Sequence, residues 1–150
     1  MTRRVVWLPC TEVVAGLHAP MVTTRLKFGD KTTSKIKFVV DSGASLSMVP
    51  RHLISDLFRL EDFPAENESG LLDASGKALK GVFMDFDVVI EGASRLPETH
   101  ERFLVCRNIR WSLLGMTWFE KLGVHFRNFP HVPQGRRFAL YPSGAPGSGM

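Results

Sequence analysis

Apolar and polar residues alternate along much of the chain, as they do in β-strands that cover one side of a core. The pattern is clearest in residues 82–90, where the apolar residues occupy every second position: Val82, Met84, Phe86, Val88 and Ile90. Asp85 and Asp87 fall on the opposite face, so we expect solvated strand residues and not catalytic acids. Further strands are expected where β-branched and aromatic residues gather, at residues 21–28, 35–40, 102–106 and 136–142.

Two segments have helical spacing. In residues 51–60 leucine, isoleucine and phenylalanine recur at the spacing of a helix face, and Pro50 suits the first turn. A second helix is expected over residues 116–122, ended by Gly123, with Trp118 packed in the core or at a dimer contact. Turns are predicted at Gly29-Asp30, Ser75-Gly76 and Glu91-Gly92, and a polar exposed loop at residues 61–70. These elements predict a mainly β domain with one or two short helices.

Composition places the chain among soluble globular domains. It has 150 residues, of which 44% are hydrophobic and 23% charged, enough for one domain with a core of its own. The net charge of +4 is modest, and the Arg-Arg pairs at residues 3–4 and 136–137 lack interleaved aromatic residues. We therefore expect no nucleic acid as a primary ligand. No segment approaches the roughly 20 apolar residues of a membrane span.

Cysteine and histidine usage argues against metal or disulfide chemistry. Cys10 and Cys106 are isolated, and the histidines form no zinc-binding pattern, so we expect neither a metal nor a cofactor. Cys106, within the apolar segment RFLVC, is expected to be buried. The N-terminal apolar stretch stops at Pro9, shorter than the roughly 7–15 residues of a signal peptide core. This favours a cytoplasmic protein, unless the chain is cut from a larger precursor.

One segment, FVVDSGASLSMVP at residues 38–50, suggests a chemistry. An apolar strand leads directly into Asp41, and a tight loop follows, which Gly43 permits because glycine tolerates a positive φ. Ser42 can hydrogen-bond within the loop or across to a partner, and Ala44 is small enough for another backbone to approach. The pattern places a carboxylate at the end of a buried strand.

Asp-Ser-Gly alone is more often an ordinary polar turn than an active site. Its surroundings change this interpretation, because an apolar strand followed by Asp-Ser-Gly-Ala-Ser resembles the active-site loop of retropepsin-like aspartic proteases, the retroviral and retrotransposon type. The resemblance implies a catalytic Asp41, loop support from Ser42 and Gly43, and substrate contacts from Ala44. It also implies a closed acid-protease barrel with one active-site loop per subunit.

Three other segments resemble retropepsins in the expected order. Residues 19–23 resemble the first long strand, and LDASGKALKG at residues 72–81 resembles the flap hairpin. Leu-Leu-Gly at 113–115, with the helix after it, resembles the closing segment. The flap would contribute substrate-binding residues at its tip: Asp73, Ala74, Ser75 and Gly76. We accordingly expect an N-terminal extension at residues 1–18, a protease domain at 19–141 and a flexible Gly/Pro/Ser tail at 142–150.

Three positions depart from the viral pattern. Viral enzymes commonly carry an acid where this chain has Ser45 and arginines where it has Met116 and Ala19, and these residues form an ion cluster between subunits. The joint absence favours a different dimer contact and a retrotransposon or cellular relative. The chemistry expected of Asp41 does not depend on this cluster.

The number of active-site motifs predicts the assembly. Aspartic proteases use two facing carboxylates, and the chain has a single Asp-Ser/Thr-Gly motif; residues 73–76 have a different spacing. The sequence therefore predicts a two-fold symmetric homodimer with Asp41 of each subunit at the axis. The terminal segment 136–142 is a candidate for a sheet shared between subunits, as terminal strands are in relatives.

The resemblance implies an aspartic endopeptidase that cleaves extended polypeptide segments, such as a polyprotein that includes the enzyme, best at mildly acidic pH. Such an enzyme would act in the cytoplasm, or in a virus-like particle if it belongs to a retroelement polyprotein. One alternative is a catalytically silent retropepsin-fold domain that dimerises or binds peptides. Another is a basic nucleic-acid adaptor, which salt-dependent retention on heparin or DNA would reveal.

Overall fold

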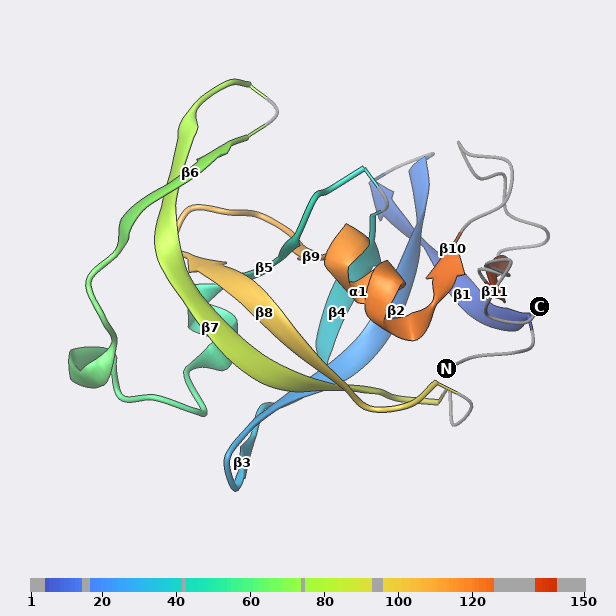
Figure 1. Cartoon of the computed structure of the whole chain (residues 1–150), viewed down its shortest axis with the longest axis horizontal. Coiled ribbons are helices and arrows are strands. Elements are labelled where there is room, and N and C mark those ends of the chain that lie inside the picture. The colour runs from blue at the N-terminus through green and yellow to red at the C-terminus, as the bar shows by residue number, and fades with distance from the viewer. Residues whose placement is uncertain are drawn as a thin grey trace.

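The structure, a computed structural model, describes residues 5–14, 17–41, 43–73, 75–92, 96–125 and 137–142. Short strands make up most of this part, and Figure 1 shows them with one helix. The strands are β1 (Val6–Val14), β2 (Leu17–Phe28), β3 (Lys31–Thr32), β4 (Ile36–Val40), β5 (Ser47–Pro50), β6 (Asn67–Leu72), β7 (Ala78–Ile90), β8 (Thr99–Cys106), β9 (Ser112–Leu114), β10 (Val124–His125) and β11 (Arg137–Pro142). The helical segments are α1 (Met116–Leu122) and the 3-10 turns η1 (Arg51–Ile54) and η2 (Leu60–Asp62).

A ring of strands closes into a barrel. β2 pairs with β4 on one side and with β7 on the other, both antiparallel. From β4 the ring continues through β9 and β5 to β8, with parallel β4–β9 and β5–β8 pairs. β8 then pairs antiparallel with β7 and so completes the circle. This closure confirms the predicted mainly β, retropepsin-type barrel.

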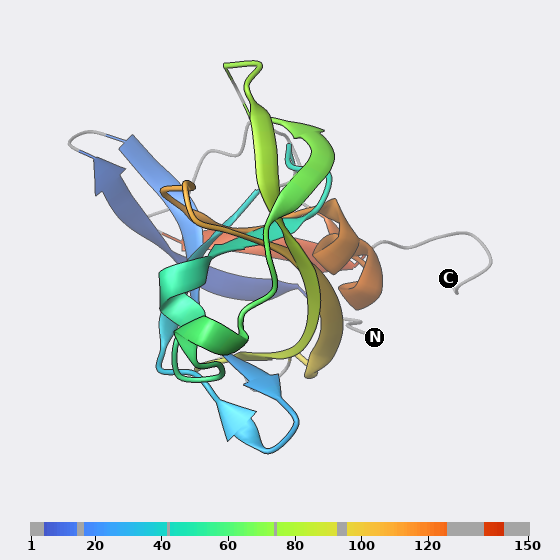
Figure 2. The same cartoon turned by 90° about the vertical axis from the view of Figure 1, so that its left-hand side faces the viewer.

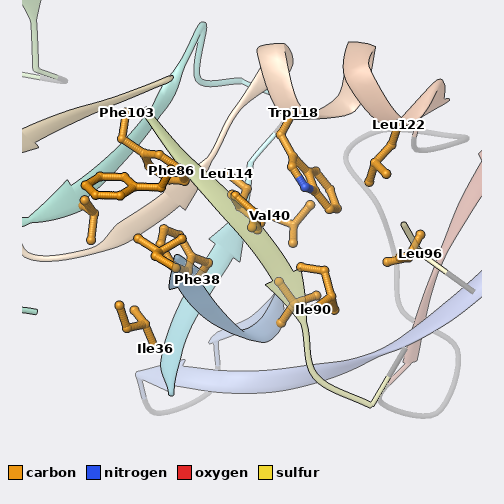
Figure 3. Packing of buried hydrophobic residues seen from close by; sticks show 14 of the residues in the cluster. Ile36, Phe38, Val40, Phe86, Ile90, Leu96, Phe103, Leu114, Trp118 and Leu122 are labelled. Carbon is orange, nitrogen blue, oxygen red and sulfur yellow. The ribbon is translucent and has the colours of Figure 1, made fainter. Parts of the chain in front are cut away.

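Alternation along β7 sorts its residues as predicted. Phe86 and Val88 are almost completely buried, and Phe86 stacks near Phe103 of β8 with ring centroids 5.8 Å apart. Figure 3 shows these rings in one cluster with Trp118 of α1. On the opposite face Asp85 pairs with Arg102 at 3.0 Å, and Asp87 pairs with His100 at 2.9 Å. The two acids therefore bind partners on the solvent side, an arginine and a histidine, as expected for strand residues that face solvent.

The helix predicted over residues 51–60 is wrong. The chain forms the 3-10 turn η1 and then bends through residues 55–57, before a second short turn, η2. The apolar residues Ile54 and Leu57 are both buried, and they are three residues apart. A 3-10 turn repeats every three residues, so it buries this pair without a regular α-helix.

The helix predicted over residues 116–122 is confirmed. Gly123 ends α1 in the left-handed conformation, with φ 67° and ψ 43°, and its N–H bonds to the carbonyl of Glu120 at 3.1 Å. Trp118 is completely buried, which places it in the core of this chain. No helix among the described residues has both the length and the apolar composition needed to cross a membrane.

Residues 61–70 are only partly the predicted loop, because residues 67–70 belong to β6. Together β6 and β7 form a hairpin that projects beyond the barrel (Figure 1). β6 alternates between exposed and half-buried positions and contains no buried residue. A strand so exposed accepts polar residues, which explains why its composition resembled a loop.

The terminal strands pair within the chain. β1 pairs antiparallel with β2 and also with β11, and β10 lies on the other side of β11. In the candidate intersubunit segment at residues 136–142, β1 pairs with residues 137–140 and β10 with residues 141–142, so its described part pairs within its own chain. Of the tail expected at residues 142–150, Pro142 belongs to β11 and the rest lies outside the described residues.

Candidate active site

Asp41 follows the last residue of β4 and is held by its backbone. Its N–H donates to the carbonyl of Leu114 in β9 at 2.9 Å, while its own carbonyl accepts from Ala44 at 3.2 Å. The N–H of Gly43 donates to the carboxylate Oδ1 at 2.9 Å. Within the described part of the chain no group bonds to Oδ2, and the side chain is only partly buried. One carboxylate oxygen is thus held by the loop, while Oδ2 accepts no hydrogen bond from the described residues.

Gly43 lies directly against the carboxylate of Asp41. A Cβ at this position would lie 3.2 Å from Oδ1 of Asp41, which is closer than ordinary side-chain packing allows. The hydrogen bond from the Gly43 N–H draws the two residues together, and a side chain would obstruct this approach.

The loop is also held from the side of β9 and α1. The N–H of Met116 donates to the carbonyl of Ala44 at 2.8 Å, so the backbone comes close to this small residue. A Cβ at Gly115 would lie 2.4 Å from the carbonyl oxygen of Leu46 and 2.8 Å from that of Ala44. Only glycine fits between these backbone groups. The Leu-Leu-Gly segment thus contacts the loop directly.

Gly115→Ala tests this close contact. Because the obstructing atoms belong to the backbone, we expect the loop to shift and the free energy of unfolding to fall by about 1–3 kcal/mol. Urea unfolding measures the loss, and the amide NMR signals of Ala44 and Leu46 report the shift. Gly29→Ala is the control. Its φ of 62° is unfavourable for alanine, but no atom lies within 4 Å of the added Cβ, so this variant measures backbone strain without a close contact. Wild-type stability and unchanged loop signals in Gly115→Ala would contradict the packing.

A buried carboxylate that the sequence analysis missed lies beneath the loop. Glu101 of β8 has no exposed surface, and its Oε2 accepts hydrogen bonds from the hydroxyls of Ser47 and Thr117, both at 2.6 Å. The Ser47 hydroxyl in turn accepts from the N–H of Gly115 at 3.0 Å. Lys121 lies 3.3 Å from Oε1. This Glu101 network joins β5, β8 and α1 through charge-assisted hydrogen bonds.

The sequence did contain a sign of this network. Glu101 lies on the same face of β8 as Phe103 and Val105, which are both fully buried. Strand alternation therefore places an acid on the core side, where an unpaired carboxylate is costly. Such a position requires hydrogen-bond donors, but their identity depends on which segments pack there.

A cleft of about 630 Å³ opens beside Asp41. Its lining comes from the active-site loop, from the β6–β7 hairpin and from residues 108–113. The volume lies within the range of sites for small ligands or peptide side chains. Of the predicted site residues, four line this cleft: Asp41, Gly43, Ala44 and Asp73. Ser75 and Gly76 are exposed at the hairpin tip, and Ser42 and Ala74 lie outside the described residues.

Asp73 organises the tip of the hairpin. Its Oδ1 accepts from the hydroxyl of Ser75 at 2.6 Å and from the N–H groups of Ser75 and Lys77, each at 2.9 Å. These bonds favour the charged form, so the Ser75 hydroxyl, and after it the Lys77 amide, lowers the pKa of Asp73. Gly76 has φ 86°, as the turn requires. The carboxylate of Asp73 is therefore engaged within the turn.

The tip turn is expected to lose its stability only in strong acid. A carboxyl whose pKa is lowered by folding stabilises the fold above its ordinary value of 3.8, and this contribution disappears as the pH falls through the lower folded value. Hydrogen exchange of the Ser75 and Lys77 amides should show constant protection from neutral pH to about pH 5. Asp73→Ala removes the acceptor of these hydrogen bonds and gives the protection of the two amides in a turn without them. Protection in wild type that falls already at pH 6 would contradict this assignment.

The described residues offer little support for metal chemistry or for a cysteine nucleophile. They contain no group of three or more His, Cys, Asp or Glu side chains that could hold a metal ion. Cys106 is buried, and burial raises the pKa of its thiol to about 11. A thiol in this state is a poor nucleophile.

The comparison with solved structures identifies the fold. No protein-family model matches the sequence, and no curated protein matches it. The structure is similar to EIAV protease complexed with the inhibitor HBY-793, with 18% identity and a TM-score of 0.50, over 75% of this chain and 94% of that one. It is also similar to a retropepsin-like aspartic protease from Rickettsia conorii, with 21% identity and a TM-score of 0.61, over 91% of this chain and 98% of that one. The chain therefore has the fold of retropepsin-like aspartic proteases.

Proposed function

We propose that this chain is one subunit of an aspartic endopeptidase that works as a two-fold symmetric homodimer. The observation that carries the proposal is the placement of Asp41, which directly follows β4 and lines a cleft of about 630 Å³ that the β6–β7 hairpin also lines. A strand-end carboxylate with one free oxygen is suited to proton transfer. Since the sequence has a single such motif, a second copy must supply the facing acid.

The chemistry follows from two like charges held close together. Two adjacent carboxylates cannot both ionise without a large electrostatic cost, so the pair keeps one proton, and aspartic proteases are the standard example. The ionised Asp41 takes a proton from a water molecule, which attacks the peptide carbonyl. The partner subunit's Asp41 donates its proton to the carbonyl oxygen. Activity is therefore expected to be highest at mildly acidic pH, where one proton is retained.

The substrate in this proposal is an extended polypeptide segment, such as one within a polyprotein that includes the enzyme. The cleft has more apolar than polar lining, and Leu71, Leu72 and Leu79 of the hairpin contribute to it. Apolar walls suit side chains of a bound peptide, whose backbone can pair with strand edges. Closure of the hairpin over the peptide would exclude water from the reacting groups.

The test compares wild type with Asp41→Asn on a peptide library, with and without a pepstatin-type inhibitor. Inhibitor-sensitive cleavage by wild type alone is expected. Equal turnover by the two proteins would eliminate the catalytic assignment, and binding of peptides without cleavage would favour the silent peptide-binding domain. Sedimentation of the active preparation provides a second check, because a fully active monomer would contradict the need for two copies of Asp41.

A further inference from the structure

A second cavity, of about 520 Å³, lies beside η1 and outside the catalytic cleft. Figure 2 shows η1 and η2 between the projecting β6–β7 hairpin and the β2–β3 hairpin at the opposite end. The cavity is lined by three arginines and a histidine, together with apolar side chains, and by no carboxylate. The charged and aromatic residues that line it are Arg51, His52, Phe58, Arg59, Phe63 and Arg107. We call this site the arginine cavity.

The arginines retain unused hydrogen-bond donors. Among the described residues Arg51, Arg59 and Arg107 form no ion pair, whereas other surface cations do. Arg51 stacks over the ring of Phe63, with its guanidinium carbon 4.5 Å from the ring centroid. A stacked guanidinium still presents the N–H groups along its edge to an anion. The arginine cavity therefore has positive charge and directed donors but no described acceptor.

The acids next to η1 and within η2 do not line this cavity. Asp56 accepts hydrogen bonds from the N–H and the hydroxyl of Ser34, both at 3.0 Å, which directs its carboxylate elsewhere. Glu61 and Asp62 of η2 are exposed, and neither lines the cavity. An occupant that brings its own carboxylates would thus find partners that the chain itself does not supply.

Two segments connect the arginine cavity with the catalytic cleft. Met48 of β5 lines the cleft, and Arg51, three residues further along, lines the cavity. Likewise Asn108 lines the cleft while its neighbour Arg107 lines the cavity. Three residues of extended chain span about 10 Å. The cleft and the arginine cavity are therefore close enough for one extended peptide of several residues to reach both.

We propose that the arginine cavity is a second recognition site, which binds an acidic stretch of polypeptide that also carries an apolar side chain. The guanidinium groups of arginines match carboxylates in geometry, and the rings of Phe58 and Phe63, which pack edge to face with centroids 6.1 Å apart, offer an apolar surface to a side chain. A polypeptide fits better than a small anion, because charged and apolar side chains line the same cavity and two short segments link it to the cleft. The identification of this polypeptide with the substrate depends on the proposed protease function.

The experiment measures binding to Asp41→Asn protein, which avoids cleavage of the probe. The probe is an octapeptide with four glutamates around one phenylalanine, and its glutamine analogue is the neutral comparison. Calorimetry should detect binding of the acidic peptide that Arg51→Gln/Arg107→Gln weakens about tenfold, since each exposed ion pair contributes up to a few-fold. Lys31→Gln/Lys37→Gln removes the same charge from exposed sites outside the cavity and should leave affinity within about twofold.

Several results would overturn the proposal. Equal weakening by the arginine pair and the lysine pair would indicate unspecific charge attraction. Tighter binding of an octanucleotide that the arginine pair abolishes would assign the site to nucleic acid. Arg107→Gln alone provides a check on folding, because Arg107 makes no described hydrogen bond or ion pair and its loss should still weaken binding measurably.

Cleavage by the wild-type chain separates the two proposals. A substrate extended by the acidic stretch should have a lower KM than the unextended substrate, at similar kcat, and the arginine pair should remove this difference. Normal cleavage without arginine-dependent binding would refute the second site and leave the protease. Arginine-dependent binding without any cleavage would refute the protease and support the site.

Discussion

Asp41→Asn is expected to reduce kcat/KM for peptide cleavage by at least about a thousandfold, because a general acid or base contributes roughly 10²–10⁴ and both active-site acids of the dimer are replaced at once. Asparagine has the shape of aspartate and keeps an oxygen that can accept from the N–H of Gly43, a bond of 2.9 Å in the wild type. The fold should therefore persist. Steady-state kinetics beside urea unfolding curves would show lost activity at unchanged stability.

Mixtures of the two proteins test whether the site is shared. If chains exchange freely, active dimers form in proportion to the square of the wild-type fraction, so an equimolar mixture should show about half the activity of the same wild-type chains alone. Lys37→Gln chains, altered at an exposed position of β4, are the matched control and should cause no loss. Activity that stays constant on addition of Asp41→Asn chains would show that one chain contains a complete site.

Glu101→Ala is expected to lower the free energy of unfolding by about 2–4 kcal/mol, because two buried hydroxyls lose their acceptor and Lys121 loses its ion-pair partner. Ser47 and Thr117 each donate to Glu101 at 2.6 Å, and Glu101 has no exposed surface. Lys121 is itself 42% exposed, so water can solvate it, and the cost is smaller than for a fully buried pair. Urea unfolding measures this loss directly.

Glu101 should also act on catalysis as a positioning residue. The hydroxyl of Ser47, which Glu101 orients, accepts from the N–H of Gly115, and Gly115 packs against the loop that carries Asp41. We expect Glu101→Ala to lower kcat several-fold with a smaller change in KM, measured where the variant remains fully folded. Glu101→Gln keeps the shape and one acceptor oxygen, so it should recover part of both losses.

A surface acid provides the matched control for Glu101. Glu91 pairs with Arg25 at 2.6 Å, but both side chains are more than a third exposed. Glu91→Ala should cost at most about 1 kcal/mol and leave kcat unchanged. If Glu101→Ala proves no more costly than Glu91→Ala, the buried network does not stabilise the fold as described here.

Local patterns were sufficient to predict most of the barrel and the position of its carboxylate. The alternation in residues 82–90 is a property of consecutive residues, and the buried face of β7 follows from it directly. The apolar strand before Asp41 likewise needs no distant partner to be recognised. The helix expected over residues 51–60 forms only as the 3-10 turn η1 at residues 51–54, because Ile54 and Leu57, the two fully buried residues, are three residues apart.

The sequence by itself determined the strands with a marked apolar pattern, such as β4 and β7, and the loop that carries the acid, because these depend on neighbours along the chain. Only the tertiary structure decided that a side chain at position 43 would meet Asp41, that Glu101 contacts Ser47 and Thr117, and that arginines line a second cavity. Each of these features joins segments that are close in space, and their contacts arise when strands and turns pack together. Close packing and the hydrogen bonds of buried polar groups depend on residues that are distant in the sequence, so a local sequence pattern cannot identify them.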